Sequence, residues 1–394
     1  MAQGAPTFTE QDLQHWKLLA DFRACLQPHL DNFPLHSSWS DPRRRLQCAD
    51  YLSLFLFALV NPVVTTLRGV SAATQLARVQ AEVSTRAVSL GSFSEAQHLL
   101  DPALLEPLLE SLAGQVRGPL PDGPRAAWQE WFARDSSLFA ALPRMSWALY
   151  GGGKAGVRNN AVRLHLSFHL LDDKPARAQI TTGKRCERKV WREDWQAGAA
   201  YVGDRYFSQD YALFGQLQER GCRYVVRLGD PAVVTVEEEL PVSDTDRAAG
   251  VTRQAWARLG WRPSRQSVRV RVVWIALAAG GELRLVTNVG PEHLSAAEVG
   301  LLYRRRWQIE CFFRWVKCLL GCRHWLAESE GGVTIQLYLA LIASVLLQLA
   351  TGRRPNKRAL ELFQMYQLGW ASLEELLAGL AREEAAAARR KKTK

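Results

Sequence analysis

The sequence contains little that would suit a secreted or disulfide-stabilised protein. It has seven cysteines, an odd number, and no two of them stand in C-x-x-C spacing. The segment after Met1 is interrupted by Gln3, Thr9 and Glu10, so it lacks the apolar stretch of a secretory signal. We therefore expect free thiols in a reducing cytoplasm. A zinc site could be suggested by four residues that are close in the sequence: Cys311, Cys318, Cys322 and His324. Because they include no C-x-x-C pair, we expect instead that the cysteines are small buried residues that bind no metal.

Long hydrophobic runs are also scarce. Residues 333–350 form the only stretch that approaches a membrane span in length, and they include Thr334, Gln336, Ser344 and Gln348. We expect a buried core helix there and no membrane association. The chain is 47% hydrophobic and 23% charged, which is ordinary for a globular protein and excludes wholesale disorder and fibrous repeats.

Lysine is rare among the basic residues. The chain has 50 Lys+Arg against 39 Asp+Glu, a net charge of +11, and only 10 of the 50 are lysines. A guanidinium group binds phosphate through two parallel hydrogen bonds, whereas an ammonium group is a point charge. The composition therefore favours nucleic acid as a partner. The alternative is that the arginine content only reflects a genome rich in G and C.

The periodicity of apolar residues predicts helices in the first ~125 residues, at 49–60, 72–83 and 99–112, with helix starts at Ser94 and Asp101. A linker rich in Pro and Gly follows at 118–124. The basic turn from Asp41 to Arg45 is either a solvated surface run or a phosphate contact, and the sequence favours neither.

The middle of the chain alternates strands and helices. We expect strands at 128–135, 162–171, 176–182, 199–203 and 224–228, with a helix at 211–221. Gly151, Gly152 and Gly153 before Lys154 lack the spacing of a phosphate-binding loop, so a flexible loop is favoured. Residues 231–288 suggest strands at 233–240, 267–277 and 282–289, with one basic side formed by several arginines: Arg262, Arg265, Arg269, Arg271 and Arg284.

A long amphipathic helix is predicted from 295 to about 320, followed by the apolar helix and by one more helix near 360–380. At 100° per residue, Tyr303, Arg306, Glu310 and Lys317 lie within roughly 60° of arc on one face of the long helix. A solvent-exposed stripe with an Arg306–Glu310 ion pair would explain the spacing alone. It would not explain the many large aromatic residues around the stripe, so a functional site is an equal alternative.

Two aspartates could join Glu310. Asp135 and Asp204 each follow a predicted strand, and side chains at the carboxyl ends of strands in an α/β sheet face the ligand crevice. Three carboxylates suit hard cations, and a pair of Mg²⁺ ions would support phosphodiester displacement. Taken singly, a strand-end Asp is more often a turn or cap residue.

The spacing Y-x2-R-x3-E-x6-K at Tyr303, Arg306, Glu310 and Lys317 resembles the signature of the bacterial insertion-sequence DDE transposases of the IS-four family. The segments around Asp135 and Asp204 resemble that family's two aspartate segments, and the similarity extends over roughly 130–345. Ser136 stands where the family usually has Gly after its first aspartate. Near the second aspartate the family usually has a Gly between the neighbouring residue and an aromatic, whereas here Arg205 is followed directly by Tyr206. Three other acids compete less well with Asp204: Asp172, Asp173 and Asp210.

The resemblance implies an α/β fold with an RNase H-like catalytic domain interrupted by a mostly β insertion, an N-terminal helical domain and a C-terminal helical segment. The corresponding boundaries are 1–126 for the N-terminal DNA-binding domain, 127–230 and 289–350 for the catalytic domain, 231–288 for the insertion, and 351–394 for the C-terminal helix and basic tail.

The implied activity is cut-and-paste DNA transposition at terminal inverted repeats, with Asp135, Asp204 and Glu310 holding two Mg²⁺ ions for which Mn²⁺ can substitute. The implied partners are transposon ends, target DNA and a second copy of the chain, in a bacterial cytoplasm at the nucleoid. A domesticated DNA-binding protein and a hydrolytic nuclease of the same fold are the alternatives.

The resemblance also implies that Tyr303, Arg306 and Lys317 contact DNA near the transposon end. Trp307 or Trp274 could stack on a flipped base, although a core position is favoured for Trp274. His165 is either a DNA contact or an ordinary histidine on a sheet face, and the two are held equal.

Overall fold

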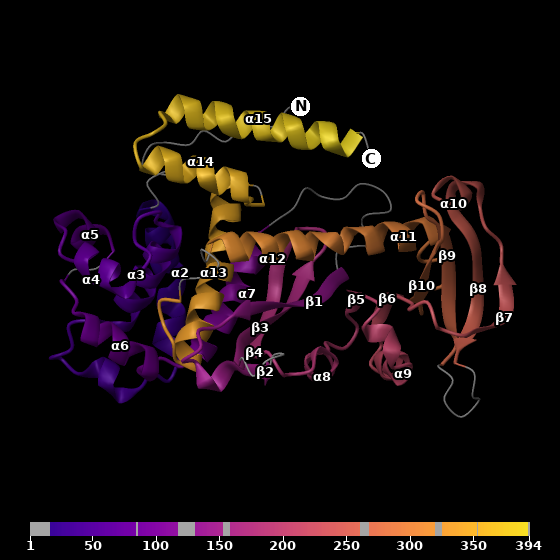
Figure 1. Ribbon diagram of the computed structural model, residues 1–394, viewed down its shortest axis with the longest axis horizontal. Coiled ribbons are helices and arrows are strands. Elements are labelled where there is room, and N and C mark those ends of the chain that lie inside the picture. The colour runs from indigo at the N-terminus through magenta and orange to yellow at the C-terminus, as the bar shows by residue number, and fades with distance from the viewer. Residues whose placement is uncertain are drawn as a thin grey trace.

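The computed structural model describes residues 16–83, 86–116, 131–152, 158–260, 268–319, 325–352 and 354–392. Helices from the N-terminal region, a long sheet and its outer strands follow one another along the molecule, and two C-terminal helices lie above them (Figure 1). The predicted linker at 118–124 and the residues Cys322 and His324 lie outside the described residues.

The N-terminal region is helical, as predicted. Its helices are α2 (Trp16–Asn32), α3 (Cys48–Val60), α4 (Leu67–Ala73), α5 (Ala77–Glu82), α6 (Leu90–Leu99) and α7 (Leu105–Gln115). The predicted helix at 72–83 is in fact divided between α4 and α5. Asp101 caps the turn before α7 by accepting a hydrogen bond from the Ala103 N–H, as expected. The predicted start at Ser94 is wrong, because Ser89 caps α6 instead.

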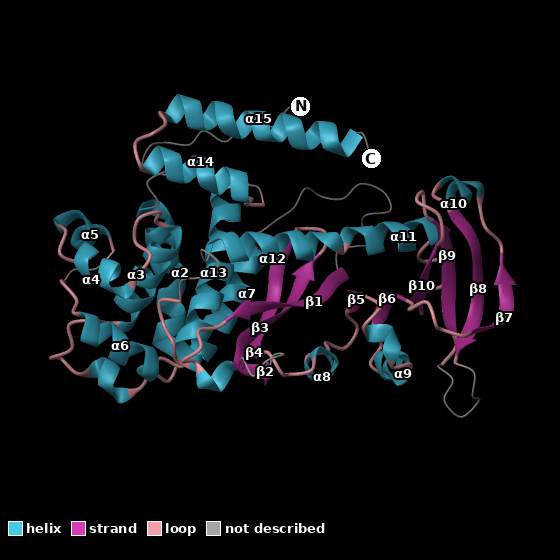
Figure 2. Cartoon of the chain, viewed as in Figure 1, coloured by secondary structure: helices cyan, strands magenta, loops and turns pink. Residues whose placement is uncertain are grey.

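Five strands form the centre of the sheet. They are β1 (Trp131–Ala140), β3 (Arg158–His169), β4 (Lys174–Thr182), β5 (Ala200–Gly203) and β6 (Arg223–Arg227). β1 pairs antiparallel with β3, and β3 with β4, whereas β5 lies parallel to β1 and β6 parallel to β5. This order, β4-β3-β1-β5-β6, is that of the expected RNase H-like fold. Helix α8 (Glu187–Glu193) connects β4 to β5, and helix α9 (Ala212–Glu219) connects the parallel strands β5 and β6 (Figure 2).

The alternating pattern at 162–171 does form a strand, but both of its faces are covered. Leu164, Leu166 and Phe168 are buried on one face, and His165 and Ser167 are buried on the other. The expected glycine loop is partly wrong, since Gly151 and Gly152 lie in β2 (Leu149–Gly152), which pairs with β3. Residues 153–157 are outside the described part of the chain.

The β insertion continues the same sheet. It consists of β7 (Val234–Leu240), α10 (Asp244–Ala248), β8 (Val251–Leu259), β9 (Val270–Ala276) and β10 (Glu282–Thr287). β10 pairs antiparallel with β6, so the insertion extends the catalytic sheet outward to β7. β8 was not predicted, because a bulge between Val251 and Arg253 interrupts its two-residue alternation.

The prediction that the insertion has one basic side is wrong for the arginines that the structure describes. Arg271 is fully buried, Arg269 pairs with Glu237 and Glu238, and Arg284 donates to main-chain carbonyls, including that of Gly229. Arg262 and Arg265 lie outside the described residues.

The long amphipathic helix consists of α11 (Ala296–Arg305) and α12 (Trp307–Leu319), which lie end to end on either side of Arg306 (Figure 1). α13 (Glu330–Thr351) is long and apolar enough to cross a membrane, but 83% of its most apolar window is buried. Inside the protein the Ser344 hydroxyl accepts a hydrogen bond from Trp315 Nε1 at 2.8 Å. The prediction of a core helix is confirmed.

The C-terminal helix predicted at 360–380 is two helices. α14 (Lys357–Gln367) and α15 (Leu373–Lys392) pack against each other as a hairpin. Gly369, with φ +74°, forms the turn, and glycine adopts this left-handed conformation without the steric cost of a side chain.

Candidate active site

Strand register brings Asp135 and Asp204 together. The parallel ladder of β1 and β5 ends with Ala133 opposite Val202, and each aspartate stands two residues farther along its own strand. Neighbouring strands lie about 4.8 Å apart, so the two carboxylates start from adjacent positions on the same face. Asp204 follows β5 directly, as predicted. Asp135 does not end its strand, because β1 continues beside β3 as far as Ala140.

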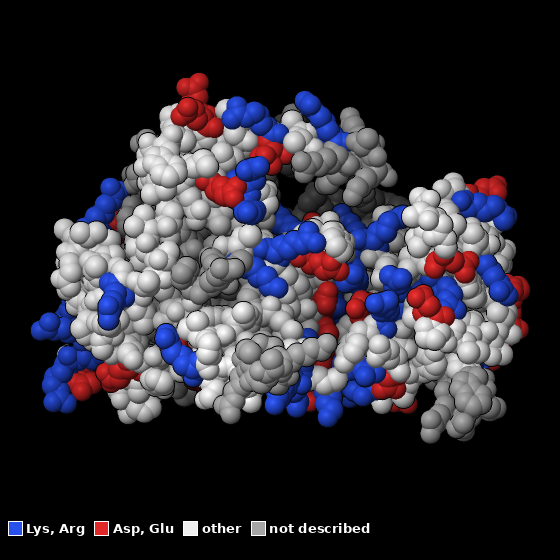
Figure 3. Space-filling model, viewed as in Figure 1, with Lys and Arg blue, Asp and Glu red and all other residues white. Residues whose placement is uncertain are grey.

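Glu310 reaches the aspartates from the first turn of α12, which packs against β1. Arg306, at the junction of α11 and α12, connects the acids. Its Nη1 lies 3.2 Å from Asp135 Oδ2 and its Nη2 lies 2.6 Å from Glu310 Oε1. The three side chains are only 12–28% exposed. Acidic side chains gather below the long helix near the centre of this face, with basic side chains around them (Figure 3).

The electrostatic environment of Asp135 is unfavourable to a lone carboxylate. Burial raises the pKa of Asp135 to about 6, and the charges of Asp204 and Glu310 act in the same direction. Arg306 and the Ser136 N–H, which donates to Asp135 Oδ1 at 2.8 Å, oppose that rise. The pKa of Asp135 therefore responds to the charges of both other predicted acids, Asp204 and Glu310.

A fourth acid beside this group was not predicted. Burial raises the pKa of Glu187 to about 7, and the charges of Asp135 and Asp204 add to the effect. Glu187 is the first residue of the seven-residue helix α8. A glutamate in the first turn of a short helix usually interacts with the helix dipole, so nothing in the sequence marks it as part of the acidic group.

Within the described part of the chain, no three His, Cys, Asp or Glu side chains already have the arrangement that holds a metal ion. The guanidinium group of Arg306 lies between Asp135 and Glu310 and bonds to both. A long side chain such as that of Arg306 can change its rotamer more easily than strands can move.

The competing acids are engaged elsewhere. Asp210 forms an ion pair with Arg192, and Asp172 lies 2.8 Å from Lys174 Nζ. Asp173 lies in the β3–β4 turn with φ +51°. Of these four aspartates, only the charge of Asp204 raises the pKa of both Asp135 and Glu187.

Two other residues of the helical stripe, Tyr303 and Lys317, take part in contacts between a cation and an aromatic ring. The Arg306 guanidinium carbon lies 5.7 Å from the centre of the Tyr303 ring, and the Lys317 ammonium lies 5.3 Å from the Phe139 ring centre. Trp307 is 49% exposed, which is unusual for its size. Cys311 and Cys318 are partly exposed, so they are not the fully buried residues that were favoured.

His165 and Trp274 lie away from solvent. His165 is buried, its Nε2 lies 3.0 Å from Thr181 Oγ1, and burial with nearby Arg163 lowers the pKa of the ring to about 3. These contacts favour the sheet-face interpretation of His165. Trp274 is 6% exposed, as expected for a core position.

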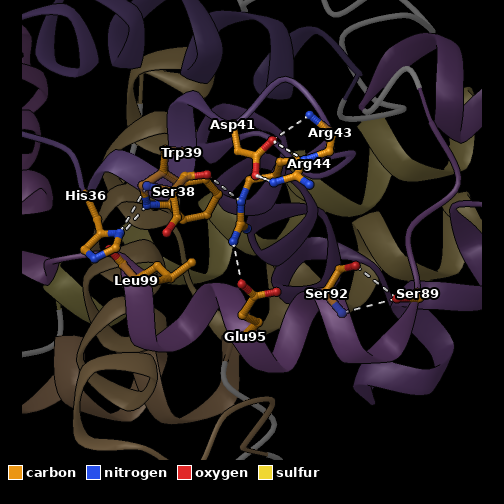
Figure 4. A network of polar contacts seen from close by, with 10 residues as sticks. All are labelled: His36, Ser38, Trp39, Asp41, Arg43, Arg44, Ser89, Ser92, Glu95 and Leu99. Carbon is orange, nitrogen blue, oxygen red and sulfur yellow. Dashed lines mark hydrogen bonds and ion pairs between the residues drawn. The ribbon is translucent and has the colours of Figure 1, made fainter.

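The basic turn near residue 41 has two parts (Figure 4). Arg44 stacks 4.6 Å from the Trp39 ring centre, donates to the Ser38 carbonyl at 3.0 Å and pairs with Glu95 at 2.8 Å. Its side chain is 9% exposed, so it stabilises the turn. Arg43 is 90% exposed, and Arg45 is also exposed.

Comparisons with known proteins place this site in context. Residues 129–346, more than half of the chain, match the family described as Transposase DDE domain. The chain is 32% identical over 206 residues to a transposase for insertion sequence element IS5377 of Geobacillus stearothermophilus, and the match covers 52% of each chain. The chain therefore spans about half the length of that curated relative.

Two further similarities are more distant. The chain is 22% identical over 343 residues to a transposase for insertion sequence element IS4SA of Synechocystis, covering 84% of this chain and 89% of the relative. Among solved structures, a piggyBac transposase synaptic complex with hairpin DNA is similar with a TM-score of 0.41 and 11% identity, covering 93% of this chain and 82% of that one.

Proposed function

Because the chain belongs to the Transposase DDE domain family, we propose that it moves an insertion sequence by cut-and-paste transposition. In this proposal the protein binds terminal inverted repeats, cuts the DNA with water and joins the freed 3′-OH to target DNA. The observation that carries the proposal is that Arg306 bonds to both Asp135 and Glu310, while the register of β1 and β5 puts Asp204 next to Asp135. Three acids from three elements more than 60 residues apart have no evident structural reason to converge.

We infer that Asp135, Asp204 and Glu310 hold two Mg²⁺ ions, with Mn²⁺ as a substitute. The residues fit such ions, because all three offer carboxylate oxygens and two of the three already flank one cationic group. When bound, the ions would activate the attacking oxygen and stabilise the leaving one. Arg306 must turn away from the acids for the carboxylates to bind metal together.

Arg306 has a second role in this proposal. Its Nε is buried and has no hydrogen-bond partner among the described residues, so its bonding capacity is not exhausted by the two acids. A DNA phosphate near the acids would offer oxygens to that donor and to the Nη groups. Lys317 and Tyr303 line the same face, and together these residues would offset the repulsion between the carboxylates and DNA.

We also infer functions for the remaining parts of the chain from their location and exposure. We infer that the helices of residues 1–126 recognise the ends, through exposed residues such as Arg43 and Arg45. Trp307 is sufficiently exposed to stack on an extruded base. The α14–α15 hairpin with its basic tail would join two copies in a homodimer, and the protein would act on the nucleoid in the cytoplasm.

The proposal is tested with Glu310→Gln and oligonucleotides that carry the element's terminal repeats. The variant should lose strand cleavage in Mg²⁺ by about 10³-fold or more while retaining end binding, because only a metal ligand is removed. The exposed Glu374→Gln on α15 is the matched control and should cleave normally. Normal cleavage by Glu310→Gln would show that Glu310 is not a metal ligand of the active site. Cleavage without joining would indicate a nuclease, and binding by the wild type without cleavage would indicate a domesticated binder.

A further inference from the structure

The short connection between α13 and α14 has a restrained backbone. α13 ends at Gly352, which has a left-handed φ of +65°, and the Asn356 side chain caps the first turn of α14. Arg354 lies between these two caps, and the following Pro355 favours an extended backbone for it. The position from which the Arg354 side chain extends is therefore fixed on both sides.

Arg354 holds α12 at its first turn. Its Nη2 donates to the Gln308 carbonyl at 2.8 Å, and its Nη1 donates to Gln308 Oε1. The guanidinium carbon lies 5.5 Å from the centre of the Phe168 ring on β3, and the centre of that ring lies 5.1 Å from the centre of the Phe312 ring on α12. Arg354 thus joins the C-terminal segment to α12 and to the sheet at one point.

These bonds are not those of an ordinary ion pair. Arg354 is partly buried, and within the described part of the chain its hydrogen bonds go to neutral groups only. Burial lowers the pKa of Arg354, and the charge of Asp173 does not fully offset this effect. Because an apolar side chain often fills such a position at no loss of stability, the arginine points to a role beyond holding the fold.

Gln308 and Glu310 lie on opposite flanks of α12. They are two residues apart, which corresponds to an angle of about 160° around the helix axis. Gln308 faces Arg354, whereas Glu310 bonds to Arg306 beside Asp135. The helix itself lies between β1 and α14, which is drawn above it in Figure 1. Arg354 therefore braces α12 from the side away from the acids.

The break between α11 and α12 leaves the rotation of α12 without a continuous helix to fix it. Arg306 caps the end of α11, and the Ile309 N–H donates to the Arg306 carbonyl three residues back rather than four. Glu310 follows directly in the first turn of α12. Any turning of α12 about its own axis would move the Glu310 carboxylate sideways.

We propose that Arg354 is a positioning residue that holds Gln308, fixes the rotation of α12 and thereby keeps Glu310 beside Asp135. This inference rests on the proposed function, in which Glu310 acts in DNA cleavage. A displacement of about 1 Å at a reacting group can cost about 100-fold in rate, so a loosened α12 should slow cleavage without weakening DNA binding.

The first experiment compares the wild type with Arg354→Gln, Arg354→Lys and the control Arg284→Gln. Arg284 is matched to Arg354, because it is also partly buried and donates only to neutral carbonyls, those of Gly229, Asp230 and Ala232. Single-turnover cleavage at saturating end-containing duplex, the Kd for that duplex and the unfolding temperature are measured for each protein.

We expect Arg354→Gln to cut at least about 10-fold more slowly while its Kd stays within about 2-fold of the wild type. Arg354→Lys should be intermediate, because an ammonium group can bond the Gln308 carbonyl but lacks the planar fork. Arg284→Gln should cut at the wild-type rate even where its unfolding temperature falls as far as that of Arg354→Gln.

A second experiment tests whether Arg354 acts through α12. Gln308→Met should slow cleavage alone but add no further loss to Arg354→Gln, because both changes remove the same contact. Amide hydrogen exchange in EDTA should be faster in α12 of Arg354→Gln than in the wild type and unchanged there in Arg284→Gln.

A wild-type cleavage rate in Arg354→Gln would overturn the inference and leave the proposed function intact. Equal slowing in Arg354→Gln and Arg284→Gln, additive losses with Gln308→Met, or unchanged exchange in α12 would also overturn it. If Arg354→Gln does not fold, Gln308→Met decides, and a wild-type rate in that variant contradicts the inference. A wild type that cuts no end-containing duplex in Mg²⁺ would contradict the proposed function itself.

Discussion

Arg306 joins two acids that lie far apart in the sequence, since Asp135 is 171 residues away from it and Glu310 only four. The spacing of Arg306 and Glu310 could be predicted, because a helix places residues four apart on one face. Asp135 and Asp204 could be predicted only as residues near strand ends, and their adjacency depends on the β1–β5 register. Glu187 could not be predicted, since its importance comes from what surrounds it.

Replacing Arg306 should separate its structural role from its effect on metal binding. In EDTA, Arg306→Gln should lower the free energy of unfolding by roughly 2 kcal/mol, because Asp135 and Glu310 lose their shared counter-charge. Added Mg²⁺ should stabilise the variant more than the wild type, since Arg306 no longer competes for the same oxygens. Urea unfolding with and without Mg²⁺ measures both effects.

The control is Arg314→Gln, an exposed residue on the same helix that lies over Trp307. Its unfolding free energy should change by less than about 1 kcal/mol. Equal stability and an equal response to Mg²⁺ in Arg306→Gln and the wild type would contradict the role given to Arg306.

At the scale of elements, the insertion forms hydrogen bonds with the beginning of α11, and α11 leads into α12, the helix that contains Glu310. Arg271 on β9 donates to Gln254 Oε1 on β8, and its Nη1 donates to the carbonyls of Val289 and Leu294, just before α11. The Asp246 carboxylate on α10 accepts from the Ala297 N–H at 2.8 Å. The insertion therefore positions the beginning of the α11–α12 unit.

Arg271→Met should lower the free energy of unfolding by about 3 kcal/mol, because three buried acceptors lose a donor. Arg269→Met, just before β9 and two residues away, removes exposed ion pairs and a contact with the Trp256 ring, and should cost less than about 1 kcal/mol. Denaturant titration of the two variants gives the comparison. Similar losses in both would show that Arg271 does not join the insertion to α11.

Element prediction succeeded where a pattern was long and regular. α3, β3 and α13 follow from apolar periodicity in the sequence. α8 has only seven residues, with Val190 and Trp191 as its buried side chains, so it offers too little periodicity to detect. β8 was hidden by its bulge, and the break between α14 and α15 depends on Gly369 in a turn that the flanking helical pattern concealed.

At the scale of the whole molecule, the net charge of +11 is not spread evenly. On the outer strands, arginines pair with glutamates, as Arg253 does with Glu239 and Arg269 with Glu238. On the N-terminal helical region, Arg43 is exposed and pairs with Asp41, whereas Arg45 is exposed and no ion pair is seen for it among the described residues. Sequence composition could suggest nucleic acid as a partner, but only the structure separates compensated arginines from exposed ones.

DNA binding should weaken steeply as salt rises, because each phosphate contact releases counterions. The double variant Arg43→Gln, Arg45→Gln should reduce the slope of log K against log salt by at least roughly 1, because Asp41 already offsets part of the Arg43 charge. Arg253→Gln should leave the slope unchanged because Glu239 already offsets that charge. Fluorescence anisotropy with an end-containing duplex measures the slopes. If the double variant keeps the wild-type slope, Arg43 and Arg45 do not contact the DNA ends.

The central claim is that Asp135, Asp204 and Glu310 hold divalent ions together. Anomalous diffraction from crystals of the protein with cleaved end DNA and Mn²⁺ tests it most directly. The account predicts Mn²⁺ peaks within bonding distance of oxygens of all three residues, with Arg306 turned away from Asp135. Peaks bound by other residues, or an Arg306 still bonded to both acids in crystals that contain Mn²⁺, would contradict it.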